Sequence, residues 1–124
     1  MIVGLGVELV DGARFASLMA HFGPRLRARL YTEAEQAYAA GRARGAESLA
    51  ARFAAKVAAQ RALGLRGLPG RDVEVMRDGE RPPALRFHGR AAAAAQRLGV
   101  RRVALTLSHE GDFCVGHVVL EDGK

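Results

Sequence analysis

The sequence predicts an α+β domain in which a mainly antiparallel sheet packs on a long central helix. Residues 47–64 form an alanine-rich helical segment whose alanines lie on every side, so neighbouring backbone can approach it closely. Apolar strand segments stand at both ends of the chain, and the two at the C-terminal end form a hairpin. Runs of helices followed by runs of strands are typical of an α+β fold.

Length and composition limit the class of protein. With 124 residues and one cysteine, we expect one domain, 1–124, that needs no disulfide. Cys114 is expected to be a small core residue in a reducing compartment. The N-terminus lacks the pattern of a signal peptide, and no apolar run reaches the roughly 20 residues of a membrane span. We therefore expect a cytoplasmic protein with no membrane partner.

The chain is basic, with 19 Lys and Arg against 13 Asp and Glu and a formal net charge of +6. This basic charge has two interpretations. Either arginine simply replaces lysine on a solvated surface, or the charge serves to bind a phosphate-rich ligand or an acidic protein partner. Nucleic acid is not favoured as a partner, because aromatic residues make up only 6% of the chain and do not alternate with basic ones.

The first strand is predicted over residues 2–10, and Glu8 interrupts its apolar run. A carboxylate in such a strand is costly unless it is paired, protonated or bound to a metal. Glu8 is therefore either a site residue or a surface residue near the strand end. Asp11 is placed to N-cap a helix over 12–23, and Pro24 begins a short basic helical turn.

A capping box, Thr32-Glu33-Ala34-Glu35, predicts a second helix that runs to residue 40 and is followed by a loop over 41–45. The central helix then spans 47–64, with Gly64 as its C-cap. An apolar flank and an adjoining polar ridge recur along it at helical spacing. The flank consists of Leu49, Phe53 and Val57, and the ridge of Arg52, Lys56 and Gln60. Such a ridge offers a place for an anion.

The C-terminal half of the chain alternates between strands and turns. Residues 72–77 and 84–87 form a hairpin that turns at Asp78-Gly79, and a helix over 91–98 is closed by Gly99. Two further strands, 102–108 and 113–121, are joined across residues 109–112. The predicted order of elements is therefore β-α-α-α-β-β-α-β-β.

Three segments carry candidate chemistry: Gly6-Val7-Glu8, Arg52 to Lys56, and Ser108-His109. None matches a P-loop, a dinucleotide fingerprint, a zinc pattern or a serine-hydrolase elbow. From the residues alone, His109 is either a turn residue or a catalytic one, and Lys56 is either a solvated ridge lysine or a phosphate clamp.

The order of these segments resembles one family, the holo-acyl-carrier-protein synthases, which are small phosphopantetheinyl transferases. The resemblance covers nearly the whole chain and is carried by four stretches. They are Gly6-Val7-Glu8-Leu9-Val10 leading to Arg14-Phe15, residues 22–35, Arg52-Phe53-Ala54-Ala55-Lys56-Val57-Ala58, and Leu105-Thr106-Leu107-Ser108-His109 with the last strand from Cys114 to Glu121.

The resemblance implies transfer of 4′-phosphopantetheine from coenzyme A to a serine of apo-acyl carrier protein, with release of adenosine 3′,5′-bisphosphate. It also implies a bound Mg²⁺ and a homotrimer with sites between subunits. The residues that match the family positions are catalytic Glu8, Lys56 and His109; coenzyme A-binding Arg52, Lys56, Arg61 and His109; metal-binding Glu8; and carrier protein-binding Arg14, Arg25 and Arg27.

Three positions depart from the family pattern. Glu8 replaces an aspartate, Arg61 replaces a lysine, and Val57 replaces the glutamate that serves as a metal ligand. Glu110 is a carboxylate that could substitute for the missing ligand. The alternative hypothesis is therefore a non-catalytic homologue that binds coenzyme A or acyl carrier protein.

Overall fold

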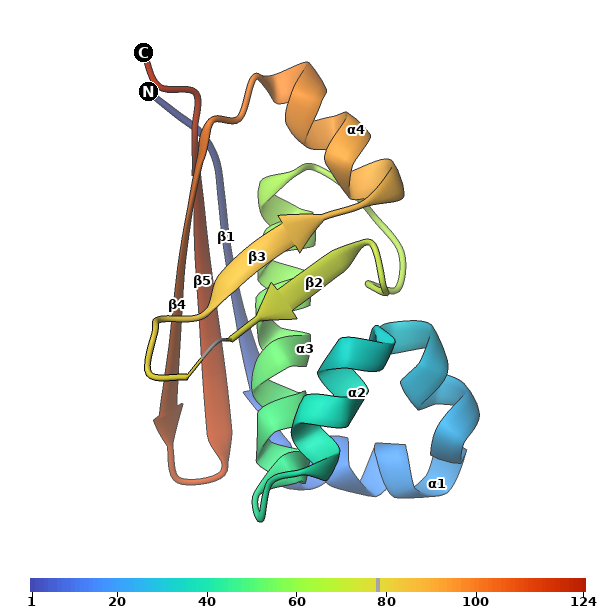
Figure 1. Ribbon diagram of the computed structural model, residues 1–124. Helices are drawn as coiled ribbons and strands as arrows, with labels where there is room; N and C mark the ends of the chain where they lie inside the picture. Colours follow the sequence, from blue (N-terminus) through green and yellow to red (C-terminus); the bar gives the residue numbers. More distant parts are fainter. Residues whose placement is uncertain (78) are drawn as a thin grey trace.

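The order of helices and strands is the one that the sequence predicts. The structure, a computed structural model, describes residues 1–77 and 79–124. Its elements are β1 (Ile2–Asp11), α1 (Gly12–Leu30), α2 (Glu33–Ala40), α3 (Gly45–Ala62), β2 (Val73–Met76), β3 (Ala84–Phe87), α4 (Gly89–Leu98), β4 (Arg102–Glu110) and β5 (Phe113–Glu121) (Figure 1). The α+β class is confirmed. The turn predicted at Asp78-Gly79 includes Asp78, which lies outside the described residues.

The strands form two antiparallel sheets. The larger sheet has the order β1-β5-β4, so the last strand of the chain lies between the first strand and its own hairpin partner. Its register places Glu8 opposite Gly116 and His109 opposite Cys114. The smaller sheet is the β2-β3 hairpin.

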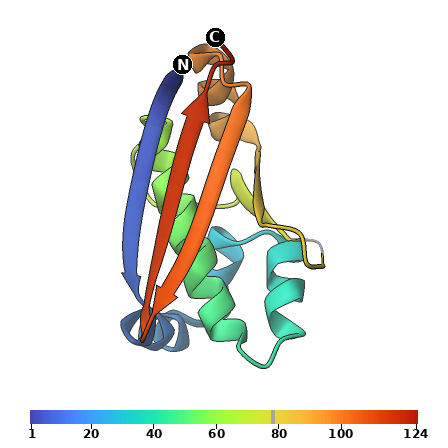
Figure 2. The same cartoon turned by 90° about the vertical axis from the view of Figure 1, so that its left-hand side faces the viewer.

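Helix α3 packs on one face of the larger sheet, and Figures 1 and 2 show it running along that face. The approach is close because glycine on the sheet meets alanine on the helix. A Cβ atom at Gly6 would clash with the carbonyl oxygen of Ala58, and one at Gly116 would lie 2.9 Å from the carbonyl oxygen of Ala54. The alanine-rich composition of α3 therefore allows it to pack close to the sheet, and this short distance determines where its longer side chains lie relative to the sheet.

Local signals place the helix ends. The Asp11 carboxylate accepts hydrogen bonds from the backbone N–H groups of Ala13 and Arg14, and the capping box of Thr32 and Glu35 is formed. The helix predicted over 12–23 and the basic turn predicted after it form one helix with a kink. Gly23, with φ of 68°, and Pro24 produce that kink.

The larger sheet has a second face, which carries apolar side chains. Leu5, Val7 and Leu9 of β1 lie there and are 68%, 50% and 58% exposed. We call the face that bears these three residues the outer face. In the part of the chain that the structure describes, no helix packs on it (Figure 2). Among the described residues, no helix is both long enough and apolar enough to cross a membrane.

Candidate active site

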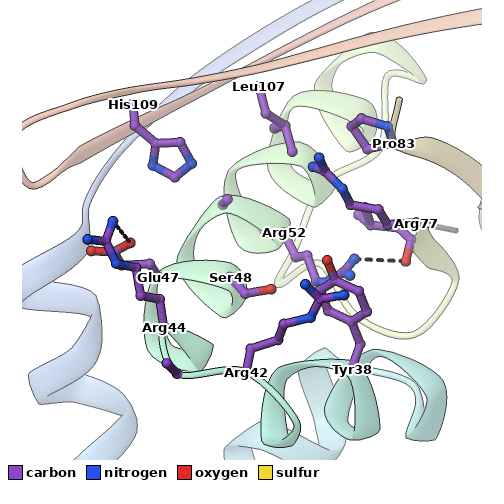
Figure 3. Close-up of a pocket in the computed structure, with 13 residues that line it drawn as sticks. Tyr38, Arg42, Arg44, Glu47, Ser48, Arg52, Arg77, Pro83, Leu107 and His109 are labelled. Carbon is purple, nitrogen blue, oxygen red and sulfur yellow. Dashed lines mark hydrogen bonds and ion pairs between the residues drawn. The ribbon is translucent and has the colours of Figure 1, made fainter. Parts of the chain in front are cut away.

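A pocket of about 430 Å³ opens between α3, the β2-β3 hairpin, β4 and the loop that precedes α3 (Figure 3). Its wall is rich in arginine and histidine side chains from elements that are far apart in the sequence. They are Arg42 and Arg44 of the loop, Arg52 of α3, Arg77 directly after β2, and His109 of β4. We call this the arginine pocket. The guanidinium groups of Arg42, Arg52 and Arg77 lie together and suit a ligand with several negative charges, whereas Arg44 is paired with Glu47 at 3.7 Å (Figure 3).

Arg52 is held rigidly at the base of the arginine pocket. It is 4% exposed, and its Nη1 donates a hydrogen bond of 3.0 Å to the carbonyl oxygen of Val75. Its guanidinium lies 4.4 Å from the ring centroid of Tyr38, which Arg42 also approaches to 4.2 Å. Burial lowers the pKa of Arg52 from its ordinary value. Its Nε is also buried and has no hydrogen-bond partner among the described residues.

His109 is exposed, and its ring is turned toward the pocket (Figure 3). Its Nδ1 lies 3.4 Å from the sulfur of Cys114, the residue opposite on β5. Burial raises the pKa of the Cys114 thiol, so the sulfur keeps its proton near neutral pH. The expectation that Cys114 is a small core residue is confirmed, because it is 3% exposed.

Lys56 does not reach the pocket. Its side chain is fully buried, and its ammonium donates to Glu35 Oε1 at 2.8 Å, to the Gly70 carbonyl oxygen at 3.2 Å and to the Val73 carbonyl oxygen. Burial lowers the pKa of Lys56, and the nearby Glu35 charge acts in the opposite direction. An ammonium has three N–H donors, and all of them have partners inside the chain. The structure therefore contradicts the catalytic and coenzyme A-binding roles predicted for Lys56.

The polar ridge predicted on the central helix is buried, so the alternative that Lys56 is a solvated ridge lysine is wrong. Arg52, Lys56 and Gln60 are all buried. The helical spacing correctly placed them on one flank, but that flank faces β2 and the segment before it.

Glu8 and Arg61 meet on the opposite flank of α3. The Nη1 of Arg61 donates to Glu8 Oε1 at 3.0 Å and to the carbonyl oxygen of Val7 at 2.8 Å. Neither residue lines the arginine pocket. Apart from Lys56 and the arginines of α1, the predicted site residues thus form two groups on opposite flanks of α3, Glu8 with Arg61 and Arg52 with His109.

Comparison with known proteins identifies the family. The model of the 4′-phosphopantetheinyl transferase superfamily matches residues 4–116. The chain belongs to this superfamily. The holo-[acyl-carrier-protein] synthase of Koribacter versatilis is 43% identical over 125 residues, which cover 98% of this chain and all of that protein. The resemblance inferred from the motifs is confirmed.

Two solved structures of the superfamily match over nearly the whole chain. The holo-[acyl-carrier-protein] synthase of Neisseria meningitidis has a TM-score of 0.86 and 31% identity, over 98% of this chain and 99% of that one. The Bacillus anthracis synthase, solved in complex with CoA (3′,5′-ADP), has a TM-score of 0.78 and 32% identity, over 99% of each chain. The likeness therefore includes every element that builds the two groups of site residues.

The residues present do not fit the Mg²⁺ site expected from the superfamily resemblance. Mg²⁺ requires an octahedron of oxygen ligands, of which protein carboxylates usually supply one or two. Glu8 is ion-paired with Arg61, and Val57 has no donor atom. Glu110 is exposed and lies in the row of Asp11, three residues beyond Leu107, which shares the row of Glu8. Because successive side chains of a strand alternate between faces, Glu110 and Glu8 lie on opposite faces of the sheet. Within the described ranges, no group of three or more His, Cys, Asp or Glu side chains is arranged so that it could hold a metal ion.

The residues predicted to contact acyl carrier protein lie on α1. Arg14 and Arg25 are exposed, whereas Arg27 is half-buried and its Nε is enclosed. Leu18 and Phe22, which are 44% and 57% exposed, follow Arg14 at intervals of four residues and so share its side of the helix. The exposure of these two apolar residues could not be predicted from the sequence, because they fit the apolar face of an ordinary amphipathic helix.

The arginine pocket also contains residues that sequence reasoning missed. Tyr38, Arg42, Arg44 and Arg77 match none of the motifs considered. The only available signal was the high arginine content, which does not say which arginines converge.

Proposed function

We propose that the arginine pocket binds coenzyme A and that the chain transfers its 4′-phosphopantetheine group to a serine of apo-acyl carrier protein. The products are holo-acyl carrier protein and adenosine 3′,5′-bisphosphate. Relatives named holo-[acyl-carrier-protein] synthase share 43% of their residues with this chain over nearly its whole length. The observation that carries the proposal is the convergence of Arg42, Arg52, Arg77 and His109 on one pocket, because coenzyme A is rich in phosphate.

The enzyme contributes to this reaction mainly through charged groups held in position, rather than through covalent chemistry of its own. The serine oxygen of the carrier protein attacks the phosphorus that bears the pantetheine group. The serine O–P bond forms, the bond from that phosphorus to the bridging oxygen breaks, and the hydroxyl proton passes to a base, for which His109 is the candidate. The guanidinium groups stabilise the negative charge on the phosphoryl oxygens.

The proposed assembly is a homotrimer with its sites between subunits. The exposed side chains of Leu5, Val7 and Leu9 give the outer face an apolar surface that association would cover. A site between subunits would also allow Glu8 and Arg61 of one copy to meet the arginine pocket of the next.

We further propose that residues 1–124 form one domain and that the protein acts in the cytoplasm. The free thiol of Cys114 is consistent with that compartment.

The proposed docking surface for acyl carrier protein is the exposed side of α1. Arg14 supplies a guanidinium that can pair with carboxylates, and Leu18 and Phe22 supply apolar contacts next to it. Arg25 adds charge, while the half-buried Arg27 is less available than the sequence indicated. An acidic carrier protein complements this surface and the net charge of +6.

The transfer is tested by incubating the protein with apo-acyl carrier protein and coenzyme A and measuring the mass of the carrier protein. We expect the mass to increase by one phosphopantetheine. Arg77→Ala should raise the KM for coenzyme A by about tenfold, as expected for loss of one charge-assisted contact. Arg97→Ala, an exposed position on α4, removes the same charge away from the pocket and is the control. Binding of coenzyme A without any mass increase would favour the non-catalytic alternative.

The docking surface is tested with Arg14→Glu in the same assay. The substitution should raise the KM for acyl carrier protein at low salt and leave the KM for coenzyme A unchanged, because α1 does not line the arginine pocket. Equal carrier-protein KM values for the variant and the parent would place the docking surface elsewhere.

A further inference from the structure

The ion pair between Glu8 and Arg61 fixes a guanidinium at the β1 edge of the sheet. Both of its hydrogen bonds, to Glu8 Oε1 and to the Val7 carbonyl oxygen, come from Nη1. The N–H groups of Nη2 and Nε are not used by these bonds. The Arg61 side chain is 56% exposed, whereas Glu8 is 23% exposed. One edge of the guanidinium is therefore anchored to the protein while much of the side chain remains accessible.

A hollow of about 510 Å³ opens beside this ion pair. It is lined by Val57 and Arg61 of α3 and by Arg66 in the segment after the helix, among other residues. The hollow thus places a second guanidinium near the anchored one. A ligand with adjacent phosphate groups could accept hydrogen bonds from both.

The same arrangement disfavours a divalent cation. A cation at Glu8 would lie close to the guanidinium that is already 3.0 Å from the carboxylate, and the like charges would repel each other. Val57 stands one helical turn before Arg61 and offers no oxygen that could compensate. The Glu8–Arg61 pair is neutral overall, as is a site of two carboxylates with one bound divalent cation.

We propose that Arg61 takes the place of a divalent cation, so that its guanidinium donates charge-assisted hydrogen bonds to the diphosphate of the donor and coenzyme A binds without a metal ion. This inference rests on the proposed function for the identity of the donor. Glu8 acts as a positioning residue that holds the guanidinium in place, rather than as a metal ligand.

The binding test measures the affinity for coenzyme A by calorimetry, on protein freed of metals, in EDTA and in millimolar MgCl₂. We expect the two affinities of the parent to agree within about twofold. Arg61→Ala should weaken binding by about tenfold or more in both conditions, because it removes charge-assisted hydrogen bonds. The affinity of Arg61→Lys for coenzyme A should lie between those of the parent and of Arg61→Ala, because lysine keeps the charge but lacks the planar guanidinium group. Arg97→Ala is the control for net charge.

A variant whose coenzyme A binding should become dependent on Mg²⁺ provides a second test. Val57→Glu adds a carboxylate on the flank that carries Arg61, so it should weaken coenzyme A binding in EDTA and recover it with Mg²⁺. The free Mn²⁺ signal in electron paramagnetic resonance gives an independent readout. With coenzyme A present, Val57→Glu should sequester Mn²⁺, while the parent should sequester no more than coenzyme A alone does.

The outcomes separate this inference from the proposed function. A parent that loses coenzyme A affinity about tenfold or more in EDTA and regains it with Mg²⁺ would overturn the inference, as would tight Mn²⁺ binding by the parent. The proposed function would survive both results if the carrier protein still gained phosphopantetheine. A parent that binds coenzyme A equally in both conditions but transfers nothing supports the inference and removes the proposed function.

Discussion

Lys56 and Glu35 form a buried ion pair that joins α3, α2 and β2. Both side chains are fully buried, and Glu35 also accepts hydrogen bonds from the backbone N–H groups of Thr32 and Val75. Lys56 in turn holds the carbonyl oxygen of Val73. The pair thus fixes the strand that leads to Arg77 on the pocket wall. Its influence on coenzyme A binding is indirect.

Removal of one partner should be costly for stability. Lys56→Met leaves the Glu35 carboxylate buried without its cation and should lower the free energy of unfolding by about 3–5 kcal/mol. The double variant Lys56→Met with Glu35→Gln should be less destabilised, because no unpaired charge remains. Urea unfolding measures both. A Lys56→Met protein of unchanged stability but reduced affinity for coenzyme A would restore Lys56 as a ligand.

Glu74 provides a pH-dependent contact next to this pair. Its carboxylate lies 3.0 Å from His88 Nε2 and accepts a hydrogen bond of 2.9 Å from Thr32 Oγ1. These bonds, with His88 as the larger cause, lower the pKa of Glu74 from its ordinary value. The folded state therefore favours the ionised carboxylate more than the unfolded state does.

The stability contributed by Glu74 should vanish in acid. A carboxyl group with a lowered pKa in the folded state stabilises the protein above its ordinary pKa and loses this contribution as the pH falls through the lowered value. Glu74→Gln should thus be less stable than the parent by about 1 kcal/mol above pH 5, and the difference should shrink below about pH 4. Urea unfolding across this range measures it. A difference that does not vary with pH would show that the charge of Glu74 is not involved.

At the scale of elements, the contact between α3 and the larger sheet depends on glycine. Gly4 and Gly6 of β1 and Gly116 of β5 leave room for the carbonyl groups of Ala62, Ala58 and Ala54. This contact also sets where Arg61 stands relative to Glu8. An added methyl group on the sheet would therefore disturb both stability and the ion pair.

Gly6→Ala should be strongly destabilising because its Cβ would overlap the Ala58 carbonyl oxygen. We expect a loss of about 3 kcal/mol or more, or a protein that does not fold. Gly41→Ala is the matched control. At Gly41 the nearest atom to an added Cβ is 3.7 Å away and φ is −83°, so the change should stay within about 0.5 kcal/mol. Equal unfolding midpoints for Gly6→Ala and the parent would contradict this packing.

At the scale of the whole molecule, the proposed homotrimer depends on the outer face. Leu5 is 68% exposed in the isolated chain, and its neighbour in the register is Val119 on β5. In a homotrimer this surface would be removed from water, which is the driving force for association. The proposed site between subunits would then depend on the same surface.

Light scattering at micromolar concentration should give about three times the chain mass of 13.2 kDa. Leu5→Asp should give a monomer with little transfer activity, because a buried unpaired carboxylate opposes association. Ala93→Asp, at an exposed position on α4, adds the same charge away from the outer face and should remain assembled. A parent protein that is monomeric and fully active would rule out sites between subunits.

The sequence alone determined the order of elements, the caps at Asp11 and Thr32, and the family, whereas the central helix predicted over 47–64 spans Gly45–Ala62. The Asp11 cap, the capping box at Thr32 and Glu35, and the C-terminal hairpin depend on residues close together in the chain. The motifs that identified the family are also contiguous stretches. Such features survive in any tertiary arrangement that keeps the elements, so local patterns were sufficient.

Only the tertiary structure decided which polar side chains are available. Helical spacing put Lys56 on a polar flank, but the buried pair with Glu35 depends on how α2 and β2 pack against that flank. The Glu8–Arg61 pair likewise joins residues 53 positions apart. Periodicity tells which residues share a face of an element. It does not tell what that face meets, because contacts between elements depend on the packing of the whole chain.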